Sequence, residues 1–292
     1  MKKPGFGRII NAIMLGIFGI ICFYPFYYLL IYSFSYPKLA LSGVYLIPRG
    51  FTFSNYIAVF SRNNIMHAIF ISASRTVVGT IVTLLCSSIY AYGLTKKSMI
   101  TNKIFYKLTF FTLYINAGLI PWYLTMRFLG LKDNFMLYIL PFSIGAFYVI
   151  LMKTYFEHLP NSIEESAMID GANYFLIYSK IIMPLSKPIL ATTGLFAAVN
   201  QWNSWVDNFY LNHSQRLMTL QLLLLNFLRE TSANQSAMLY NTGQDLESLI
   251  SSVTPTSVRM TITIVAILPV FLVYPFLQKY FMKGILLGAI KG

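Results

Sequence analysis

The chain has 292 residues, of which 57% are hydrophobic and 11% are charged, and its formal net charge is +13. This composition is too apolar for an ordinary soluble domain, so the sequence predicts a membrane protein. The excess of Lys and Arg gathers on one side of the predicted topology, a pattern typical of membrane proteins, and does not indicate binding to nucleic acid.

Six apolar stretches are long enough to cross a bilayer, which takes roughly 20 mostly apolar residues per helix. The first follows Lys2, Lys3 and Arg8, as a signal peptide would, but its apolar run is too long and no small-residue cleavage pattern follows it. We therefore expect a retained helix. Prolines within the stretches predict bends. The six predicted helices lie near 9–33, 68–94, 105–126, 134–156, 185–206 and 259–281.

Lys and Arg are divided unevenly between the two sides of these helices. With the N-terminus inside, the inner segments hold 13 of them in 73 residues, whereas the outer segments hold 8 in 96. The positive-inside rule then places both termini in the cytoplasm. Segment 157–184 becomes cytoplasmic and loop 207–258 extracytoplasmic. The apolar run LMTLQLLLLNFL in that loop is too short to span a bilayer and predicts an outer packed helix or a re-entrant piece.

Arg75 is the one basic residue inside a predicted membrane helix, in its outer half. We expect its side chain to extend to the lipid headgroups, and the alternative is a role toward a cavity or a partner. Cys22 and Cys86 also lie within membrane segments, without the spacing of a metal site or a disulfide framework, and are interpreted as packing residues.

The cytoplasmic segment 157–184 predicts a short surface helix. Ser162 and Glu165 have the spacing of a capping box, and acids in a first turn suit the positive end of the helix dipole. Gly171 lets the chain leave the helix without strain, and a second helical piece should run to Pro184. This helix collects three of the nine acids of the chain: Glu164, Glu165 and Asp170.

The same segment carries a sequence motif of the form E-A-A-x3-G-x9-I-x-L-P, matched by Glu165, Ala167, Gly171, Ile181 and Pro184. Ser166 and Met183 depart from it conservatively. On this EAA motif the chain resembles, along its full length, the membrane permease subunits of binding-protein-dependent ABC importers. The stretches KPIL, NQWNSW and FMKGILLGAIKG look like the carbohydrate-uptake branch, in particular its MalG-like subunits.

The resemblance implies an all-α integral membrane protein with the type I ABC importer permease fold, as a single domain over 1–292 with six transmembrane helices. The EAA helix would sit in a cleft of a cytoplasmic ATPase and transmit closure of the ATPase dimer. Glu165 would pair with a basic group there, Ala167 would pack in the cleft, and Gly171 would form the bend. For Glu165, a capping box alone is the alternative. The expected coupling residues are Glu164, Glu165, Ser166, Ala167, Asp170 and Gly171.

The C-terminal tail resembles the extension with which this family reaches toward the ATPase dimer interface. Its expected contacts are Lys283, Gly288 and Lys291. The alternative interpretation is a loosely bound basic end without a partner.

The resemblance also implies the partners of the chain and its place in the bacterial cytoplasmic membrane. They are a second homologous permease in a heterodimer, an ATPase dimer that holds ATP and Mg, an extracellular solute-binding protein, and membrane lipid. The chain itself should bind no cofactor and catalyse no reaction: GLTKKS at 93–98 lacks the second glycine of a P-loop, and H-E-x-x-H and G-x-S-x-G patterns are absent.

The expected substrate is a carbohydrate, such as an oligosaccharide, which aromatic faces, amides and hydroxyls recognise without much charge. The fifth predicted helix ends in NQWNSW, in which Gln201 and Trp205 share one face while Trp202 lies about 100° from Gln201. The alternative is an interfacial aromatic belt. The residues proposed for the substrate path are Asn200, Trp202 and Asn203.

Two other functions remain open at this level. The EAA spacing alone also fits an ABC permease for amino acids, peptides or ions. A secondary transporter that works without an ATPase would favour duplicated halves or intramembrane carboxylates for ion coupling, and the six predicted segments contain no Asp or Glu.

Overall fold

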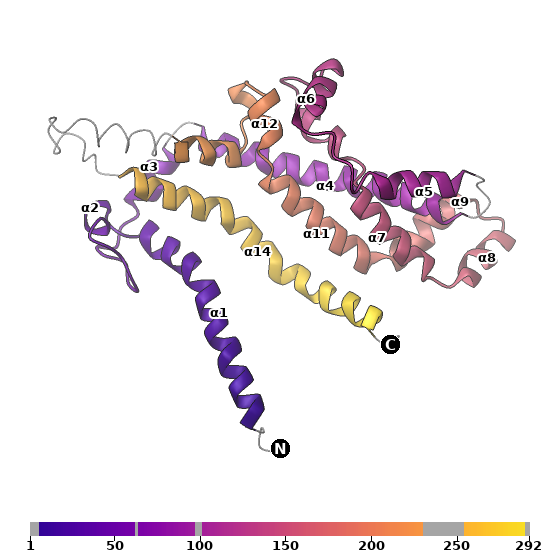
Figure 1. Cartoon of the computed structure of the whole chain (residues 1–292), viewed down its shortest axis with the longest axis horizontal. Coiled ribbons are helices and arrows are strands. Elements are labelled where there is room, and N and C mark those ends of the chain that lie inside the picture. The colour runs from indigo at the N-terminus through magenta and orange to yellow at the C-terminus, as the bar shows by residue number, and fades with distance from the viewer. Residues whose placement is uncertain (1–5, 62–63, 97–100, 230–253, 290–292) are drawn as a thin grey trace. The chain divides into compact units, whose positions relative to one another are not determined.

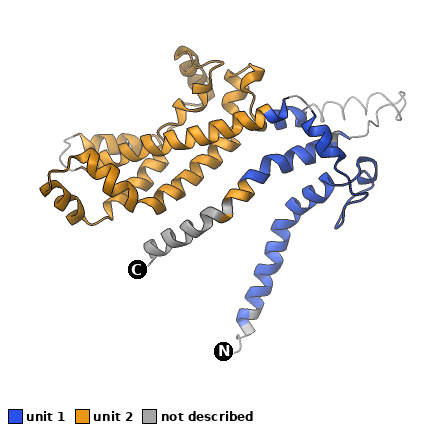
Figure 2. Cartoon of the chain, turned by 180° about the vertical axis from the view of Figure 1, so that it is seen from behind, with its two compact units in different colours: residues 1–66, 223–269 blue, residues 67–222, 270–292 orange. Residues whose placement is uncertain are grey.

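The computed structural model describes residues 6 to 61, 64 to 96, 101 to 229 and 254 to 289 (Figure 1). The described part is helical, and its β pairing is an isolated bridge between Ser35 and Phe51. The chain divides into two compact units: unit 1 comprises residues 1–66 and 223–269, and unit 2 comprises residues 67–222 and 270–292 (Figure 2).

Unit 1 contains α1 (Phe6–Ser33), α2 (Pro37–Ala40) and α3 (Ser54–Phe60), together with the first part of α14 (Pro255–Ala289). The apolar side chains of α1 are exposed along most of its length, as expected of a helix that faces lipid. A small core of Ile31, Tyr32, Ala40 and Val44 packs the C-terminal end of α1 against the loop that follows.

Unit 2 contains the candidate sites, and its longest helix is α4 (Ile65–Thr95), which begins at the unit boundary. Its main core is formed where α4, α7 and the helical run from Tyr174 to Leu185 pack together. The other elements are α5 (Asn102–Phe111), α6 (Leu119–Phe128), η1 (Phe135–Tyr138), η2 (Leu140–Phe142), α7 (Ala146–Glu157), α8 (Asn161–Ile169), α9 (Tyr174–Ile177), the π-helix η3 (Tyr178–Ile182), α10 (Met183–Leu185), α11 (Lys187–Asn203), α12 (Val206–Leu211) and η4 (Gln215–Leu217).

The third predicted helix, over 105–126, is not continuous. It forms α5 and α6, with a non-helical segment at 112–118 between them. Asn116 Oδ1 accepts a hydrogen bond from the Gly118 backbone N–H at 2.9 Å, and Gly118 has a φ of +84°. An Asn side chain that bonds the backbone two residues on competes with the helix, and glycine adopts the left-handed conformation that follows.

The fourth and fifth predicted helices are also bent. The pair Phe135–Phe142 and Ala146–Glu157 is bent by 45°, and the pair Tyr174–Leu185 and Lys187–Asn203 by 82°. Pro141 lies in η2, just before the first break, and Pro184 and Pro188 flank the second. Proline lacks the N–H that continues a helix.

Among the described residues, three helices are long and apolar enough to cross a membrane, or up to five if each bent pair counts as one span. The six-helix count and the cytoplasmic termini therefore stay predictions. The helix Leu220–Arg229 occupies the apolar run of the predicted outer loop, and 230–253 of that loop lies outside the described residues. At the other end, α14 continues to Ala289, beyond the predicted limit near 281.

Candidate functional site

Arg75 is completely buried in unit 2 and pairs with Asp207. Arg75 Nη2 lies 2.6 Å from Asp207 Oδ2, and Nη1 lies 3.2 Å from Oδ1, which is a two-bond, end-on contact. The exposed fractions of the two side chains are 0% and 1%. A buried charge is tolerated when it is paired and fully hydrogen-bonded, and both conditions hold for this guanidinium.

All five N–H donors of Arg75 have acceptors. Besides the carboxylate of Asp207, the guanidinium donates to Gln201 Oε1 from Nε at 3.3 Å and from Nη2 at 3.2 Å, and to the Ser204 carbonyl at 3.2 Å. The Tyr138 ring lies 4.3 Å from the guanidinium carbon, so the cation also contacts an aromatic face.

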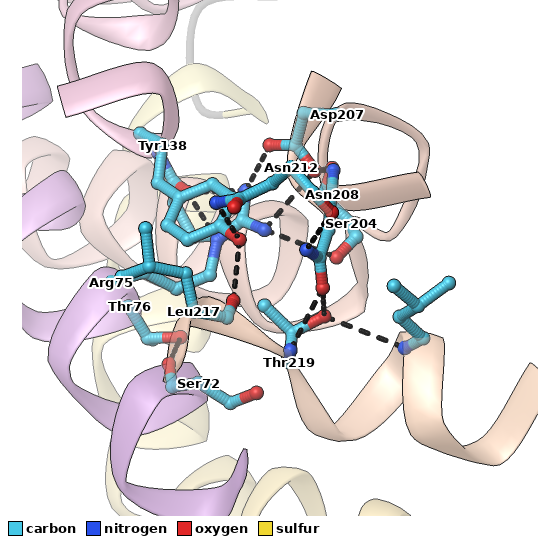
Figure 3. A network of polar contacts seen from close by, with 12 residues as sticks. Ser72, Arg75, Thr76, Tyr138, Ser204, Asp207, Asn208, Asn212, Leu217 and Thr219 are labelled. Atoms are coloured by element: carbon cyan, nitrogen blue, oxygen red, sulfur yellow. Dashed lines mark hydrogen bonds and ion pairs between the residues drawn. The ribbon is translucent and has the colours of Figure 1, made fainter. Parts of the chain in front are cut away.

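The network extends to the loop that follows α12 (Figure 3). Tyr138 donates its hydroxyl hydrogen to the Leu217 carbonyl at 2.6 Å and accepts from Asn212 Nδ2 at 2.9 Å. Asn208 Oδ1 accepts from the backbone N–H of Thr219 at 2.8 Å. These bonds join α4, η1 and α12 into one polar cluster.

The prediction that Arg75 extends to the lipid headgroups is wrong, because its side chain is enclosed and neutralised by Asp207. Sequence analysis placed Asp207 at the start of an outer loop and missed the pair. A usable signal was present, since an intramembrane cation needs a counter-charge and Asp207 directly follows the fifth predicted helix.

Next to this network, unit 2 has a partly open cavity of about 110 Å³. Gln201 belongs to both, because it lines the cavity, accepts from Arg75, and donates from Nε2 to the Tyr138 carbonyl at 3.1 Å. Tyr148 and Asn200 both line the cavity wall. The lining is uncharged and consists of Thr83, Pro141, Phe142, Ile144, Gly145, Tyr148, Ala197, Asn200, Gln201 and Ser204.

The structure brings only part of the predicted substrate path to this cavity. Asn200 lines it, whereas Trp202 and Asn203 are not among the described lining residues. Trp202 is 7% exposed and packs inside unit 2. Asn203 is exposed, and its Oδ1 accepts from Gln221 Nε2 at 3.5 Å. The helical spacing separates these three side chains, as the 100° step per residue requires.

The predicted coupling helix is α8, but its start differs from the prediction. Asn161 is its first residue, and Pro160, which has no side-chain hydrogen bond to give, occupies the cap position. Ser162 therefore lies inside the first turn, and the predicted capping box with Glu165 is wrong. The proline fixes the chain direction into the helix through its locked φ of −61° instead.

The end of α8 is a left-handed turn at Gly171, whose φ is +83°. The backbone N–H groups of Gly171 and Ala172 donate to the carbonyls of Met168 and Ala167 at 3.0 and 2.9 Å. These bonds satisfy the last carbonyls of the helix in the manner of a Schellman turn. The chain then restarts as α9, where Asn173 Oδ1 accepts from the Leu176 backbone N–H at 2.8 Å.

The two adjacent glutamates of α8 have different surroundings. Glu164 forms an ion pair with Lys96, which follows the last residue of α4, and its side chain is 23% exposed. Glu165 is exposed, as are Ser166 and Asp170. Ala167 packs instead against the core of unit 2. The structure thus places some predicted coupling residues on the outer surface and turns others inward.

The tail residues are described only in part. Lys283 and Gly288 fall within the helical span of α14, and Lys291 lies outside the described residues. Within the part of the chain that the structure describes, no group of three or more His, Cys, Asp and Glu side chains could hold a metal ion.

Comparison with known proteins identifies the family. No family model matches the chain. The sequence is 38% identical over 296 residues to the polygalacturonan/rhamnogalacturonan transport system permease protein YtcP of Bacillus subtilis (strain 168), with 100% of both chains covered. The chain belongs to the permeases of carbohydrate ABC transporters. Carbohydrate ABC permeases are multi-pass proteins of the cytoplasmic membrane, so this finding confirms the predicted resemblance and location.

Two further comparisons agree with this family assignment. The permease is 35% identical over 287 residues to protein LplC of the same organism, which covers 97% of this chain and 94% of LplC. Its structure matches a chain in the crystal structure of a bacterial ABC transporter involved in the import of the acidic polysaccharide alginate, with a TM-score of 0.83 and 33% identity. The match covers 94% of this chain and 96% of that chain, so it extends across the whole permease fold.

Proposed function

We propose that this permease is one of the two membrane subunits of an ATP-driven importer for oligosaccharides. It forms half of the translocation pathway, and α8 couples it to the conformational changes that ATP hydrolysis drives in the ATPase. The observation that carries the proposal is the outer face of α8, where Ile169 is 87% exposed beside the charged Glu165. A large apolar side chain in this position, on the side of the predicted cytoplasm, is suited to a protein partner.

The partner of α8 is a cytoplasmic ATPase with a cleft that accepts a short helix. A basic group in the cleft pairs with Glu165, and an apolar wall covers Ile169. The ATPase dimer holds ATP and Mg, and the permease binds neither. Gly171 then sets the direction in which α8 projects. A second homologous permease completes the pathway, an extracellular solute-binding protein delivers the substrate, and lipid surrounds the exposed face of α1.

The substrate class is carbohydrate. YtcP is named for polygalacturonan and rhamnogalacturonan, and the matched crystal structure for alginate. The cavity beside Gln201 presents amides, hydroxyls and aromatic rings without charge, which are the groups that bind sugar hydroxyls and ring faces. Asn200 and Tyr148 form its polar edge, so we place the substrate path along this side of α11. Trp202 and Asn203 would support the path from neighbouring faces of the helix.

Reconstitution of the complete importer in proteoliposomes tests this function. Uptake of labelled oligogalacturonides should require ATP, the ATPase and the binding protein, and Asn200→Ala should reduce it more than Asn203→Ala. Uptake without the ATPase would indicate a secondary transporter. Uptake of amino acids or peptides in place of sugars would contradict the carbohydrate assignment.

Topology can be tested separately in cells. With Cys22 and Cys86 replaced, single cysteines at Ser162 and Lys132, both exposed, should react with a membrane-impermeant thiol reagent from opposite sides. Labelling of both from outside would contradict the cytoplasmic position of α8.

A further inference from the structure

The structure assigns to Lys96 a role as a positioning residue that connects the coupling segment to the cytoplasmic end of α4. Glu164 and Glu165 then have different functions: Glu164 transmits movement inside the permease, whereas Glu165 docks on the ATPase. This inference rests on the proposed function, because it concerns how an ATPase bound to α8 moves the membrane helices.

One ammonium group contacts three helices. Lys96 Nζ forms the ion pair with Glu164 on α8, lies 3.9 Å from the centre of the Tyr92 ring on α4, and lies 5.6 Å from the centre of the Tyr174 ring on α9. Cations are attracted to aromatic faces within about 6 Å, so all three contacts are favourable. The Lys96 side chain is only 14% exposed, which limits screening of the ion pair by water and salt.

The backbone at Lys96 is fixed on the α4 side. Its N–H donates to the Gly93 carbonyl at 3.1 Å. Asn102 Nδ2 donates to the Leu94 carbonyl at 2.6 Å and to the Lys96 carbonyl at 2.9 Å, and so closes the end of the helix. Lys96 is therefore held as an extension of α4, and the position of its ammonium follows the position of that helix.

The contacts of Lys96 lie on both sides of the turn at Gly171. Glu164 lies before the turn and Tyr174 directly after it, so the ammonium connects the two arms of the bend. Ala167 and Ala172 pack near the same place against the core of unit 2. A glycine in the left-handed region adds no side-chain packing of its own, and hence the angle between α8 and α9 depends on these contacts.

Movement of α8 is transmitted to the cavity through the Lys96–Glu164 ion pair and α4. Successive helical residues differ by about 100°, so Glu164 faces Lys96 while Glu165 remains available to a partner. Along the continuous helix α4, the 21 residues between Arg75 and Lys96 correspond to about 31 Å at 1.5 Å per residue. Without the ion pair, α8 would rotate about Gly171 and leave α4 in place.

The test compares substitutions of the two adjacent glutamates and of Lys96 in the assembled importer. We expect Glu164→Gln and Lys96→Met to keep the ATPase bound during purification but to lower sugar uptake and binding-protein-stimulated ATP hydrolysis about fivefold or more, a typical lower bound for coupling between sites. Glu165→Gln should instead weaken co-purification of the ATPase. Lys103 is an exposed lysine on α5, and Lys103→Met is the matched control. It should change neither the co-purification of the ATPase nor sugar uptake and stimulated ATP hydrolysis.

Two rescue variants guard against simple misfolding. Lys96→Arg keeps the cation and should retain most uptake, and the exchange Lys96→Glu with Glu164→Lys should recover uptake relative to either single reversal. Loss of ATPase binding in Glu164→Gln, or normal stimulated hydrolysis in both Glu164→Gln and Lys96→Met, would overturn the inference while the proposed function stands. Failure of the unmodified permease to retain any ATPase would instead contradict the proposed function.

Discussion

Arg75 and Asp207 are separated by 132 residues in the chain, yet their side chains meet at 2.6 Å in the interior of unit 2. The pair joins the N-terminal half of α4 to α12 directly behind the cavity wall formed by Gln201. Because neither side chain is exposed, the pair cannot exchange its partner for water. It therefore fixes the position of α4, whose Thr83 lines the cavity, relative to α12.

Removal of one member of this pair should destabilise the permease strongly. Arg75→Met leaves the Asp207 carboxylate buried without a counter-charge, at a cost of about 3–5 kcal/mol. The double variant Arg75→Met with Asp207→Leu should cost less than the sum of the two single changes, because no uncompensated charge remains. Thermal unfolding of the purified protein in detergent measures these differences. Additive effects would contradict a direct interaction.

Gly79→Ala should disturb the same site from its other side. A Cβ at this position would lie 2.6 Å from Gln201 Nε2 and 2.7 Å from its Cδ, a clash with a side chain held at both ends by hydrogen bonds. We expect lower sugar uptake and a lower unfolding midpoint. Gly93→Ala, also in α4, meets nothing within 4 Å and is the matched control. Equal sugar uptake and equal unfolding midpoints of the two variants would contradict this prediction and would mean that the Gln201 side chain can move away.

Substitution of Gly171 should affect transport through the backbone alone. No atom lies within 4 Å of a Cβ at this position, but its φ of +83° is unfavourable for an L side chain by about 1–2 kcal/mol. Gly171→Val should lower uptake most, and Gly171→Asn least, because Asn tolerates the left-handed region. The protein should still insert into the membrane. Normal uptake by Gly171→Val would contradict a coupling function for this bend.

We expect the contact between Asp133 and the loop at His213 and Ser214 to be sensitive to acid. The backbone N–H groups of His213 and Ser214 donate to Asp133 Oδ1 at 2.7 and 3.2 Å, and the His213 bond is the main cause of the lowered pKa of this carboxyl. Its ordinary pKa is 3.8. Because the folded pKa lies below the unfolded one, the stabilisation is complete above the unfolded pKa and disappears as the pH falls through the folded pKa.

Variants of Asp133 test that contact. Asp133→Asn keeps the acceptor oxygen and suits the φ of +53°, so it should lower the unfolding midpoint at pH 7 less than Asp133→Ala does. The difference between Asp133→Asn and the unmodified protein should shrink as the pH is lowered below about 4. A difference that stays constant with pH would exclude the carboxylate charge as its source.

Much of this permease follows from local sequence patterns. The sequence predicts α1, α4 and α14 because each contains a long run of apolar residues. In lipid, such a run folds as a helix, which satisfies its backbone hydrogen bonds internally. Gly171 forms the predicted bend because glycine alone adopts its φ at little cost. The EAA spacing indicated the family, which the comparisons confirm.

Only the tertiary structure decided which charges meet. Helical periodicity relates residues three or four positions apart, but Lys96 and Glu164 are 68 positions apart and Arg75 and Asp207 are 132 apart. Their pairing depends on how α4 packs against its neighbours. The breaks near the prolines and at Asn116 interrupt helices that the composition predicts to be continuous. Local chemistry therefore determined where helices can form, whereas the need to neutralise and hydrogen-bond buried polar groups determined how they are joined.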